Sequence, residues 1–207
     1  SDKIGSDLLY DYLKKFGFGE VTGIDLQGEF SPKIREKGSW NIVDLATASF
    51  GQGIAVTPIQ LIKAGAIIAN GGIDITPQVV DKLQGVGWVH DIKPQLGQRV
   101  ISEKAAKDVT AMMVEAAKNG EAKWTALRGF KVAGKTGTAQ IPIAGHYDSE
   151  KTIASFIGFA PADNPKFVML VTLQEPQSSP WASETAAPLW FSIAKDLFSY
   201  YKIQPSE

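Results

Sequence analysis

The sequence has no cysteine and only two histidines among its 207 residues, and these absences limit the chemistry that it can perform. Without cysteine there can be neither disulfide bonds nor thiolate metal sites. His90 and His146 have no further ligands at metal-binding spacing, so we expect both at the surface. We therefore expect neither a metal site nor a cofactor.

An excess of one charge and a long apolar run are also missing. The 21 basic and 22 acidic residues give a net charge of −1 and are mixed along the chain, which argues against a nucleic-acid partner. The longest apolar run, residues 64–69, is too short to cross a bilayer. No signal peptide opens the chain, which starts at Ser1 instead of Met, so we expect a cut, processed or partial product.

The first half of the chain has helical patterns, and 44% apolar residues over this length suffice for one sizeable core. Residues 7–16 predict a short helix that is stopped by glycines. Thr57 is a good N-cap with Pro58 at the first helical position, and the helix should end at the Asn-Gly-Gly of residues 70–72. Because this helix is apolar on nearly every side except at Lys63, we expect it to be buried.

In the second half, helical patterns give way to strands. Ser102 should cap a helix that ends near residue 120 and points four apolar side chains inward: Val109, Met112, Met113 and Ala116. Short strands and turns are expected before it, over residues 75–100. Strands are expected after it at residues 130–141, 152–160 and 167–173, followed by a helix that opens at Ser183 or Thr185. This order predicts an α/β or α+β fold with an antiparallel sheet.

Residues 133–140, Ala-Gly-Lys-Thr-Gly-Thr-Ala-Gln, put an ammonium group and two hydroxyls on one short segment. In an extended strand Lys135 and Gly137 point to one face. Thr136 and Thr138 then point to the other. A twist or bulge at Gly137 would bring donors from both sets towards one groove, beside a bare backbone N–H. Such a strand can hold a carboxylate next to a developing oxyanion, which is the chemistry of acyl transfer to or from a peptide.

A second motif overlaps the first. Residues 129–136 satisfy the spelling of a phosphate-binding loop (P-loop), Gly-x-x-x-x-Gly-Lys-Thr. That loop needs flexible backbone leading into a helix N-terminus. Here Phe130 and Val132 favour a strand, and Pro142 follows with no helix in between. A nucleotide-binding protein is therefore an alternative that a helix beginning at Thr136 would support.

Lys-Thr-Gly-Thr at residues 135–138 is one of three signature elements of penicillin-binding proteins and serine β-lactamases, beside Ser-x-x-Lys and Ser-x-Asn. The chain resembles the class B (monofunctional) transpeptidases over nearly its whole length, the division-associated branch most of all. The further matching segments, in the family's order, are Phe-Gly-Phe-Gly (16–19), Thr-Gly-Ile-Asp-Leu (22–26), Ser-Phe-Gly-Gln-Gly-Ile (49–54), Thr-Pro-Ile-Gln (57–60), Asn-Gly-Gly (70–72), Ser-Phe-Ile-Gly-Phe-Ala-Pro (155–161) and Ala-Ala-Pro (186–188).

The resemblance implies a penicillin-binding-protein/β-lactamase-like transpeptidase fold, an antiparallel sheet flanked by helices. It implies a parent enzyme that is a peptidoglycan D,D-transpeptidase, in which a serine attacks the penultimate D-Ala carbonyl of a stem peptide. Lys135 would supply positive field and assist proton movement. The hydroxyls of Thr136 and Thr138 would bind the terminal carboxylate, with Gly137 between them in the substrate site. The Thr138 backbone N–H would be half of the oxyanion hole, so Lys135 and Thr138 are the expected catalytic residues.

The resemblance also implies partners and a location. The expected ligands are stem peptides ending in D-Ala-D-Ala and the β-lactams that mimic them, and divisome proteins are expected as further partners. The parent protein should act at the extracytoplasmic face of the bacterial cell membrane, held by an anchor that this chain does not contain.

The other two signature motifs are not where the family has them. Both should precede Phe16, and neither occurs in the first fifteen residues. Ser192 and Ser199 begin Ser-x-x-Lys strings, but both fall on the solvated face of the expected C-terminal helix. The opposite, apolar stripe is Trp190, Ile193, Ala194, Leu197 and Tyr201. Ser39 begins a Ser-Trp-Asn string where the family has a surface loop.

We therefore expect residues 1–207 to be the C-terminal portion of a transpeptidase domain, with its N-terminal part missing, and to be inactive alone. The alternative is a non-catalytic module that binds stem peptides or divisome proteins. Without the N-terminal part, strand 167–173 would have an unpaired apolar edge, so the chain should associate with the missing half or with a second copy.

Overall fold

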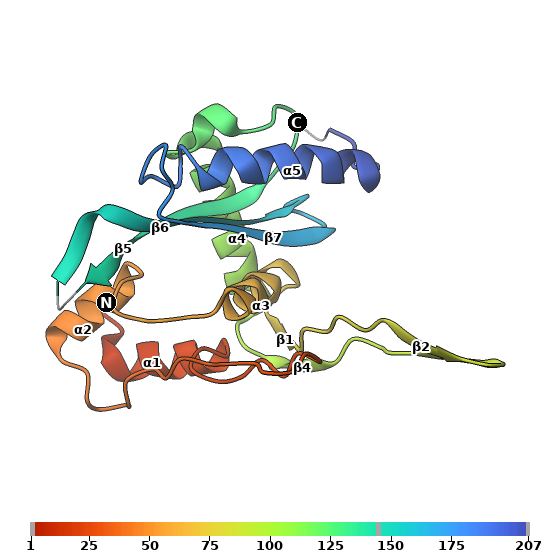
Figure 1. The fold of residues 1–207 in the computed structure, drawn as a ribbon, viewed down its shortest axis with the longest axis horizontal. Helices are drawn as coiled ribbons and strands as arrows, with labels where there is room; N and C mark the ends of the chain where they lie inside the picture. The colour runs from red at the N-terminus through yellow and green to blue at the C-terminus, as the bar shows by residue number, and fades with distance from the viewer. Residues whose placement is uncertain (1–2, 144–145, 206–207) are drawn as a thin grey trace. The chain divides into compact units, whose positions relative to one another are not determined.

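The computed structural model describes residues 3–143 and 146–205, and the side chains of residues 143–150 lie outside the description. The chain forms two compact units, Ser1–Ser102 and Glu103–Glu207 (Figure 1). Along the described parts of the chain, no helix has both the length and the apolar character that a membrane crossing requires.

The first unit contains α1 (Gly5–Lys15), α2 (Ile42–Ser49) and α3 (Pro58–Ala69). Helix α3 begins and ends where the sequence predicts, because its signals are local. Thr57 accepts a hydrogen bond from the backbone N–H of Gln60, and the side chain of Gln60 accepts one from the N–H of Thr57. The helix is buried only at Gln60, Lys63, Gly65 and Ile67, and its other residues are half-buried or exposed. Lys63, the polar exception on this helix, pairs with Asp74 at 3.0 Å.

Helix α2 was not predicted, because its cap lies inside the Ser-Trp-Asn string. The Asn41 side chain accepts hydrogen bonds from the N–H groups of Val43 and Asp44, at 2.8 and 3.0 Å. Asp44 accepts in return from the N–H of Asn41 at 2.9 Å. The string therefore ends in a helix cap, which is a structural role for Asn41.

The expected short strands that follow α3 form two antiparallel pairs. Strand β1 (Ile73–Ile75) pairs with β4 (Leu96–Arg99), and β2 (Lys82–Gly85) pairs with β3 (Trp88–Asp91). The β2–β3 hairpin extends away from the rest of its unit (Figure 1), and both of its strands are exposed.

The second unit consists of one sheet with helices against it. Helix α4 (Glu103–Asn119) and the short helix η1 (Lys123–Thr125) come first. They lead into β5 (Ala133–Ile143), β6 (His146–Ala160) and β7 (Phe167–Gln174), and α5 (Ala186–Tyr200) closes the unit. The strands form an antiparallel sheet in the order β5-β6-β7, and all three predicted strands are confirmed. Helix α5 lies across one face of this sheet, and α4 contacts β5.

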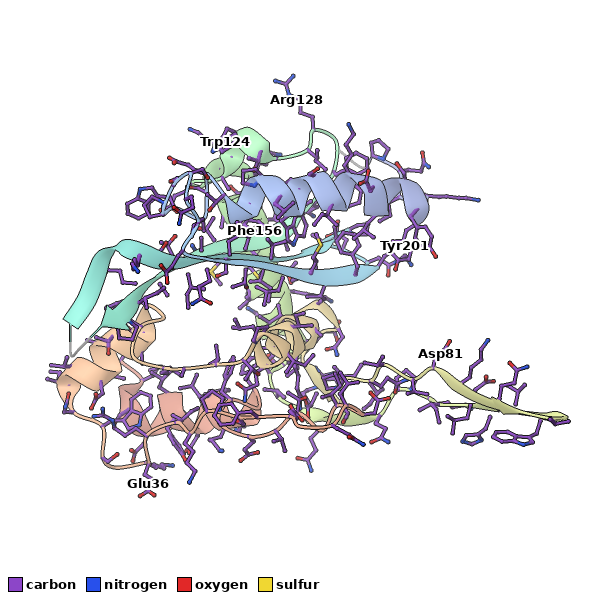
Figure 2. All side chains as sticks on the ribbon, in the orientation of Figure 1. Glu36, Asp81, Trp124, Arg128, Phe156 and Tyr201 are labelled. Atoms are coloured by element: carbon purple, nitrogen blue, oxygen red, sulfur yellow. The ribbon has the colours of Figure 1, made fainter. Side chains whose placement is uncertain are left out.

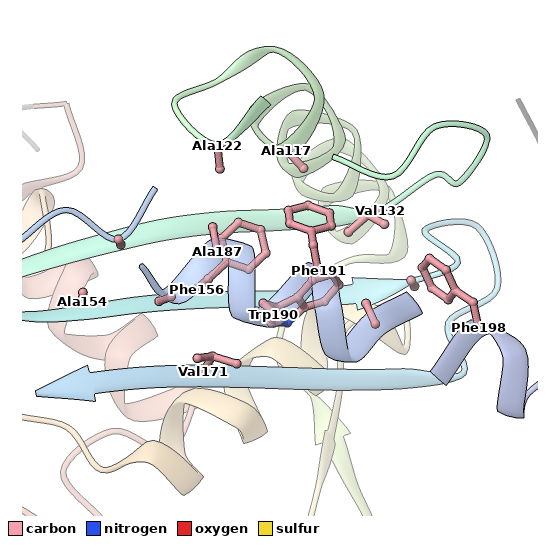
Figure 3. Packing of buried hydrophobic residues seen from close by; sticks show 14 residues of the cluster. Ala117, Ala122, Val132, Ala154, Phe156, Val171, Ala187, Trp190, Phe191 and Phe198 are labelled. Carbon is pink, nitrogen blue, oxygen red and sulfur yellow. The ribbon is translucent and has the colours of Figure 1, made fainter. Parts of the chain in front are cut away.

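The core of the second unit lies between the sheet and α5 (Figures 2 and 3). Phe156 of β6 is 1% exposed, and its ring centroid lies 5.2 Å from that of Trp190 and 5.4 Å from that of Phe191. Trp190 donates a hydrogen bond from Nε1 to the carbonyl of Met169 in β7, at 2.9 Å. This bond satisfies the one polar atom of a fully buried side chain and fixes α5 on the sheet.

The apolar faces of two helices differ from the prediction. On α5, Ile193 and Tyr201 are 37% and 45% exposed, whereas Phe191 and Phe198 are buried. The buried face of this helix follows the 3.6-residue period through residues 187, 190, 191, 194 and 198, and the predicted stripe was centred beside it. On α4, Met112 is 62% exposed, and buried positions include Val114 and Ala117 instead.

Candidate functional site

The Lys-Thr-Gly-Thr segment (residues 135–138) lies in β5, at one edge of the three-stranded sheet. There is no bulge at Gly137, since pairing with β6 is regular through this position and shifts only between Gln140 and Pro142. Gly137 serves the close approach of the strands instead. A Cβ added there would lie 2.8 Å from Oγ of Ser155, which donates to the Gly137 carbonyl at 3.3 Å.

The ammonium group of Lys135 is exposed and lies over the next residue of its own strand. Its Nζ donates to the carbonyl of Thr136 at 3.0 Å and to Oγ1 of Thr136 at 3.2 Å. Adjacent side chains of a strand point to opposite faces, so only a long side chain can fold back in this way. The structure thus brings the predicted lysine and one predicted hydroxyl into direct contact without a bulge.

The hydroxyl of Thr138 is held by a different part of the chain. Its Oγ1 accepts a hydrogen bond from the backbone N–H of Ala182, at 3.1 Å, in the segment that leads to α5. Within the described residues its hydroxyl hydrogen has no acceptor. Since a hydroxyl has one hydrogen to donate, that of Thr138 is available to a ligand.

Thr136 has a second partner that sequence reasoning missed. Its hydroxyl donates to Oε2 of Glu121 at 3.3 Å, so it links the Lys135 ammonium to a carboxylate. Glu121 lies in the turn between α4 and η1, and fifteen positions separate it from Thr136. No spacing rule or local motif connects two such positions, so the sequence held no signal for this contact.

The alternative based on the phosphate-binding loop is wrong. Lys135 and Thr136 lie inside β5, and no helix begins at Thr136. The backbone here is paired with β6, so its geometry is that of a strand and it does not cradle phosphates.

The serines of the Ser-x-x-Lys strings lie on α5, away from its buried face. Ser192 and Ser199 are exposed, as the helical pattern predicts, and so are Lys195 and Lys202. Ser199 donates to the backbone carbonyl of Lys195, at 3.4 Å. Neither serine therefore has the environment of an activated nucleophile, which needs a base held against the hydroxyl.

A cavity of about 500 Å³ is lined in part by the residues that precede the Lys-Thr-Gly-Thr segment, but no residue of the segment itself lines it. The end of α4, η1, residues 126–132 and Phe191 line it, and Trp124 and Arg128 are among these residues (Figure 2). Its walls lack Lys135, Thr136 and Thr138, which lie on the edge strand of the sheet. In the described part of the chain, no three His, Asp or Glu side chains gather as a metal site would require.

Comparison with known proteins places the chain in a family. The model of the penicillin-binding protein transpeptidase domain matches residues 1–199. Stage V sporulation protein D of Bacillus subtilis is 34% identical over 99% of the chain and 32% of its own length. Peptidoglycan D,D-transpeptidase FtsI of Escherichia coli K12 is 33% identical over 97% of the chain and 33% of its own length. The chain thus spans about a third of these relatives.

A solved structure agrees with the sequence relatives. Penicillin-binding protein 3 of Mycobacterium tuberculosis, complexed with ampicillin, has a TM-score of 0.90 and 30% identity, covering 99% of this chain and 48% of that one. The α+β architecture with antiparallel sheets is therefore that of penicillin-binding transpeptidase domains. The chain belongs to the penicillin-binding protein transpeptidase domain family, among the class B penicillin-binding proteins.

Proposed function

We propose that the chain supplies one wall of a peptidoglycan D,D-transpeptidase site, formed by the Lys-Thr-Gly-Thr segment of β5. One observation carries this proposal: an edge strand holds an ammonium group and two hydroxyls together, in a chain of the penicillin-binding transpeptidase family. In this proposal residues 1–207 are the C-terminal portion of one transpeptidase domain, and both compact units belong to that domain.

In the proposed site the hydroxyls of Thr136 and Thr138 bind the substrate carboxylate, and Thr138 and Lys135 have further tasks. Thr138 donates its hydroxyl hydrogen to the terminal carboxylate of a D-Ala-D-Ala stem peptide, because its oxygen already accepts from Ala182. Lys135 adds a positive field beside that carboxylate and assists proton movement. The Thr138 backbone N–H acts as half of the oxyanion hole, and the loss of one such donor typically costs about 3–4 kcal/mol of transition-state stabilisation.

Acylation needs an activated serine as well, and this chain does not supply one in our proposal. Its two Ser-x-x-Lys strings lie on the exposed face of α5. The 207-residue chain should therefore recognise the substrate carboxylate without forming an acyl-enzyme. The parent enzyme would cross-link stem peptides at the extracytoplasmic face of the membrane and would be trapped by β-lactams. Divisome proteins would be its further partners, as the resemblance to the division-associated branch implies.

Incubation with a fluorescent penicillin, followed by intact mass spectrometry, tests the absence of a nucleophile. We expect the unmodified mass of 22.3 kDa. A near-stoichiometric penicilloyl adduct at Ser192 or Ser199 would contradict the proposal, because it would show that the helix face carries an activated serine.

Titration with N-acetyl-D-alanyl-D-alanine, followed by amide NMR, tests recognition itself. The peptide should shift the amide signals of residues 135–138, and Lys135→Ala and Thr138→Val should each weaken binding several-fold. Lys195→Ala removes the same charge from the exposed face of α5 and serves as the matched control. If Lys135→Ala and Lys195→Ala weakened peptide binding equally, the assignment of the site to β5 would be wrong.

A further inference from the structure

Glu121 is held in place by its neighbours in the chain, although its side chain is exposed. At Gly120 an added Cβ would collide with the carbonyl of Ala116, so only glycine fits this turn. On the other side, Ala122 is 1% exposed in the core of the second unit. Its carbonyl accepts hydrogen bonds from the N–H and the hydroxyl of Thr125, at 3.0 and 2.7 Å. The backbone therefore presents Glu121 to β5 from a fixed position.

The two hydroxyls of the Lys-Thr-Gly-Thr segment differ in whether their hydrogen is already donated in a hydrogen bond. The hydrogen of Thr138 has no acceptor in the described residues, whereas that of Thr136 is already given to Oε2 of Glu121. At the same time Thr136 accepts from the Lys135 ammonium, which strengthens the bond that it donates. A carboxylate is a chemical copy of the group that ends a stem peptide, so Glu121 occupies a place that a ligand carboxylate would need.

We propose that Glu121 is an internal competitor for the carboxylate-binding hydroxyl of Thr136 and thereby sets how tightly the segment holds anionic ligands. This inference rests on the proposed function, because it assumes that the segment binds the terminal carboxylate of a D-Ala-D-Ala peptide. A ligand must displace Glu121 from Thr136 and then lie next to a like charge. Both effects lower its affinity, and both vanish when Glu121 is made neutral.

The test measures the affinity of N-acetyl-D-alanyl-D-alanine for the chain by amide NMR. Glu121→Gln should bind this peptide about 3- to 10-fold more tightly, the range expected when a competing hydrogen bond and a near like charge are lost. The C-terminal amide of the same dipeptide lacks the negative charge, and its affinity should not change. Glu115→Gln removes the same charge from the exposed side of α4, where Glu115 accepts from Asn119, and should change the affinity less than twofold.

A double-mutant cycle separates competition at Thr136 from a structural role of Glu121. Thr136→Val removes the hydroxyl for which the two carboxylates compete, so Glu121→Gln should have much less effect in that background. Unchanged affinity in Glu121→Gln, or an equal gain in Glu115→Gln, would overturn the inference. If Thr138→Val still weakened binding several-fold in that case, the proposed function would stand alone. If no variant bound the carboxylate peptide in preference to the amide, the proposed function would fail and this inference with it.

Discussion

Two glycines of β5 differ in what surrounds them, and the difference predicts unequal tolerance to alanine. A Cβ at Gly134 would run into the ring of Phe156, which is held by Trp190 and Phe191. A Cβ at Gly137 would meet only the hydroxyl of Ser155, which can rotate. We expect Gly134→Ala to lower the free energy of unfolding by about 1–3 kcal/mol, the usual cost of overpacking, and Gly137→Ala by less. Urea denaturation of both variants measures this, and an equal loss would contradict the packing argument.

The hydroxyl of Thr138 has a structural task beside its proposed one. It accepts a hydrogen bond from the backbone N–H of Ala182, which is a fully buried residue. Thr138→Val would leave that N–H without a partner, so we expect the free energy of unfolding to fall by about 1–3 kcal/mol. Thr138→Ser keeps the oxygen and should lose much less. Chemical denaturation of the pair decides the point: similar losses would mean that the methyl group of threonine, and not its oxygen, stabilises the strand.

At the residue scale the sequence predicted the hydrogen-bonding groups of the candidate site but not the residues that bind to them. Lys135, Thr136 and Thr138 stand in one short motif, so their chemistry can be read from the chain. Their partners Glu121 and Ala182 lie fifteen and forty-four positions away. Contacts of this kind are created by tertiary packing and leave no periodic signal. The roles of residues 135–138 as catalytic and substrate-binding groups remain a proposal.

At the scale of elements, the prediction succeeded where the signal was local. Helix α3 has an N-cap, a proline and a glycine stop that each act within a few residues, and its bounds were predicted closely. The buried face of α5 was placed beside the true one, because Phe191 and Phe198 owe their burial to the sheet and to Phe130 and Phe167. A helix pattern gives the period of burial but not which of several apolar residues a neighbouring sheet will cover.

The segment before β2 is held by Asp25, and this predicts a pH dependence. The carboxylate accepts from the N–H groups of Val80 and Val79, which hold the pKa of Asp25 below its ordinary value of 3.8. A lowered folded-state pKa means that this stabilisation is present above the unfolded pKa and is lost as the pH falls through the folded one. Stability of the native protein should therefore decline below about pH 4.

Urea midpoints measured from neutral pH down to pH 3 test this dependence. Asp25→Asn should be less stable than the native protein at neutral pH, and the gap should narrow in acid. Glu36→Gln removes a charge from an exposed side chain of the same unit (Figure 2), and its stability should equal that of the native protein at every pH. A constant gap between Asp25→Asn and the native protein would contradict the role of ionisation.

At the scale of the whole molecule, β7 is the element that bears on association. It pairs with β6 on one side, and no strand among the described residues pairs with it on the other. Met169, Val171 and Leu173 face the core under α5, so Val168, Leu170 and Thr172 lie on the opposite face, as the alternation predicts. An apolar edge of this kind pairs readily with another chain.

We expect the isolated chain to form dimers or larger species through β7. Size-exclusion chromatography with light scattering measures this, and Leu170→Lys should shift the population towards monomer. Leu189→Lys on α5 changes an exposed leucine away from the edge and should not. A sharply monomeric species of 22.3 kDa that melts cooperatively would contradict the expectation.

If β5 binds β-lactams as we propose, its close fit against its neighbours has a consequence for evolution under antibiotic selection. Gly134 and Gly137 leave no room for even a methyl group without displacing another atom, and Thr138 secures buried backbone. Under the proposed function, mutations of Gly134 or Thr138 that weaken binding of a β-lactam would also destabilise the fold. Glu121, in contrast, is exposed and touches the same strand through a single hydrogen bond. Heritable variation in ligand preference should therefore accumulate in the turn that carries Glu121, while the strand itself stays constant.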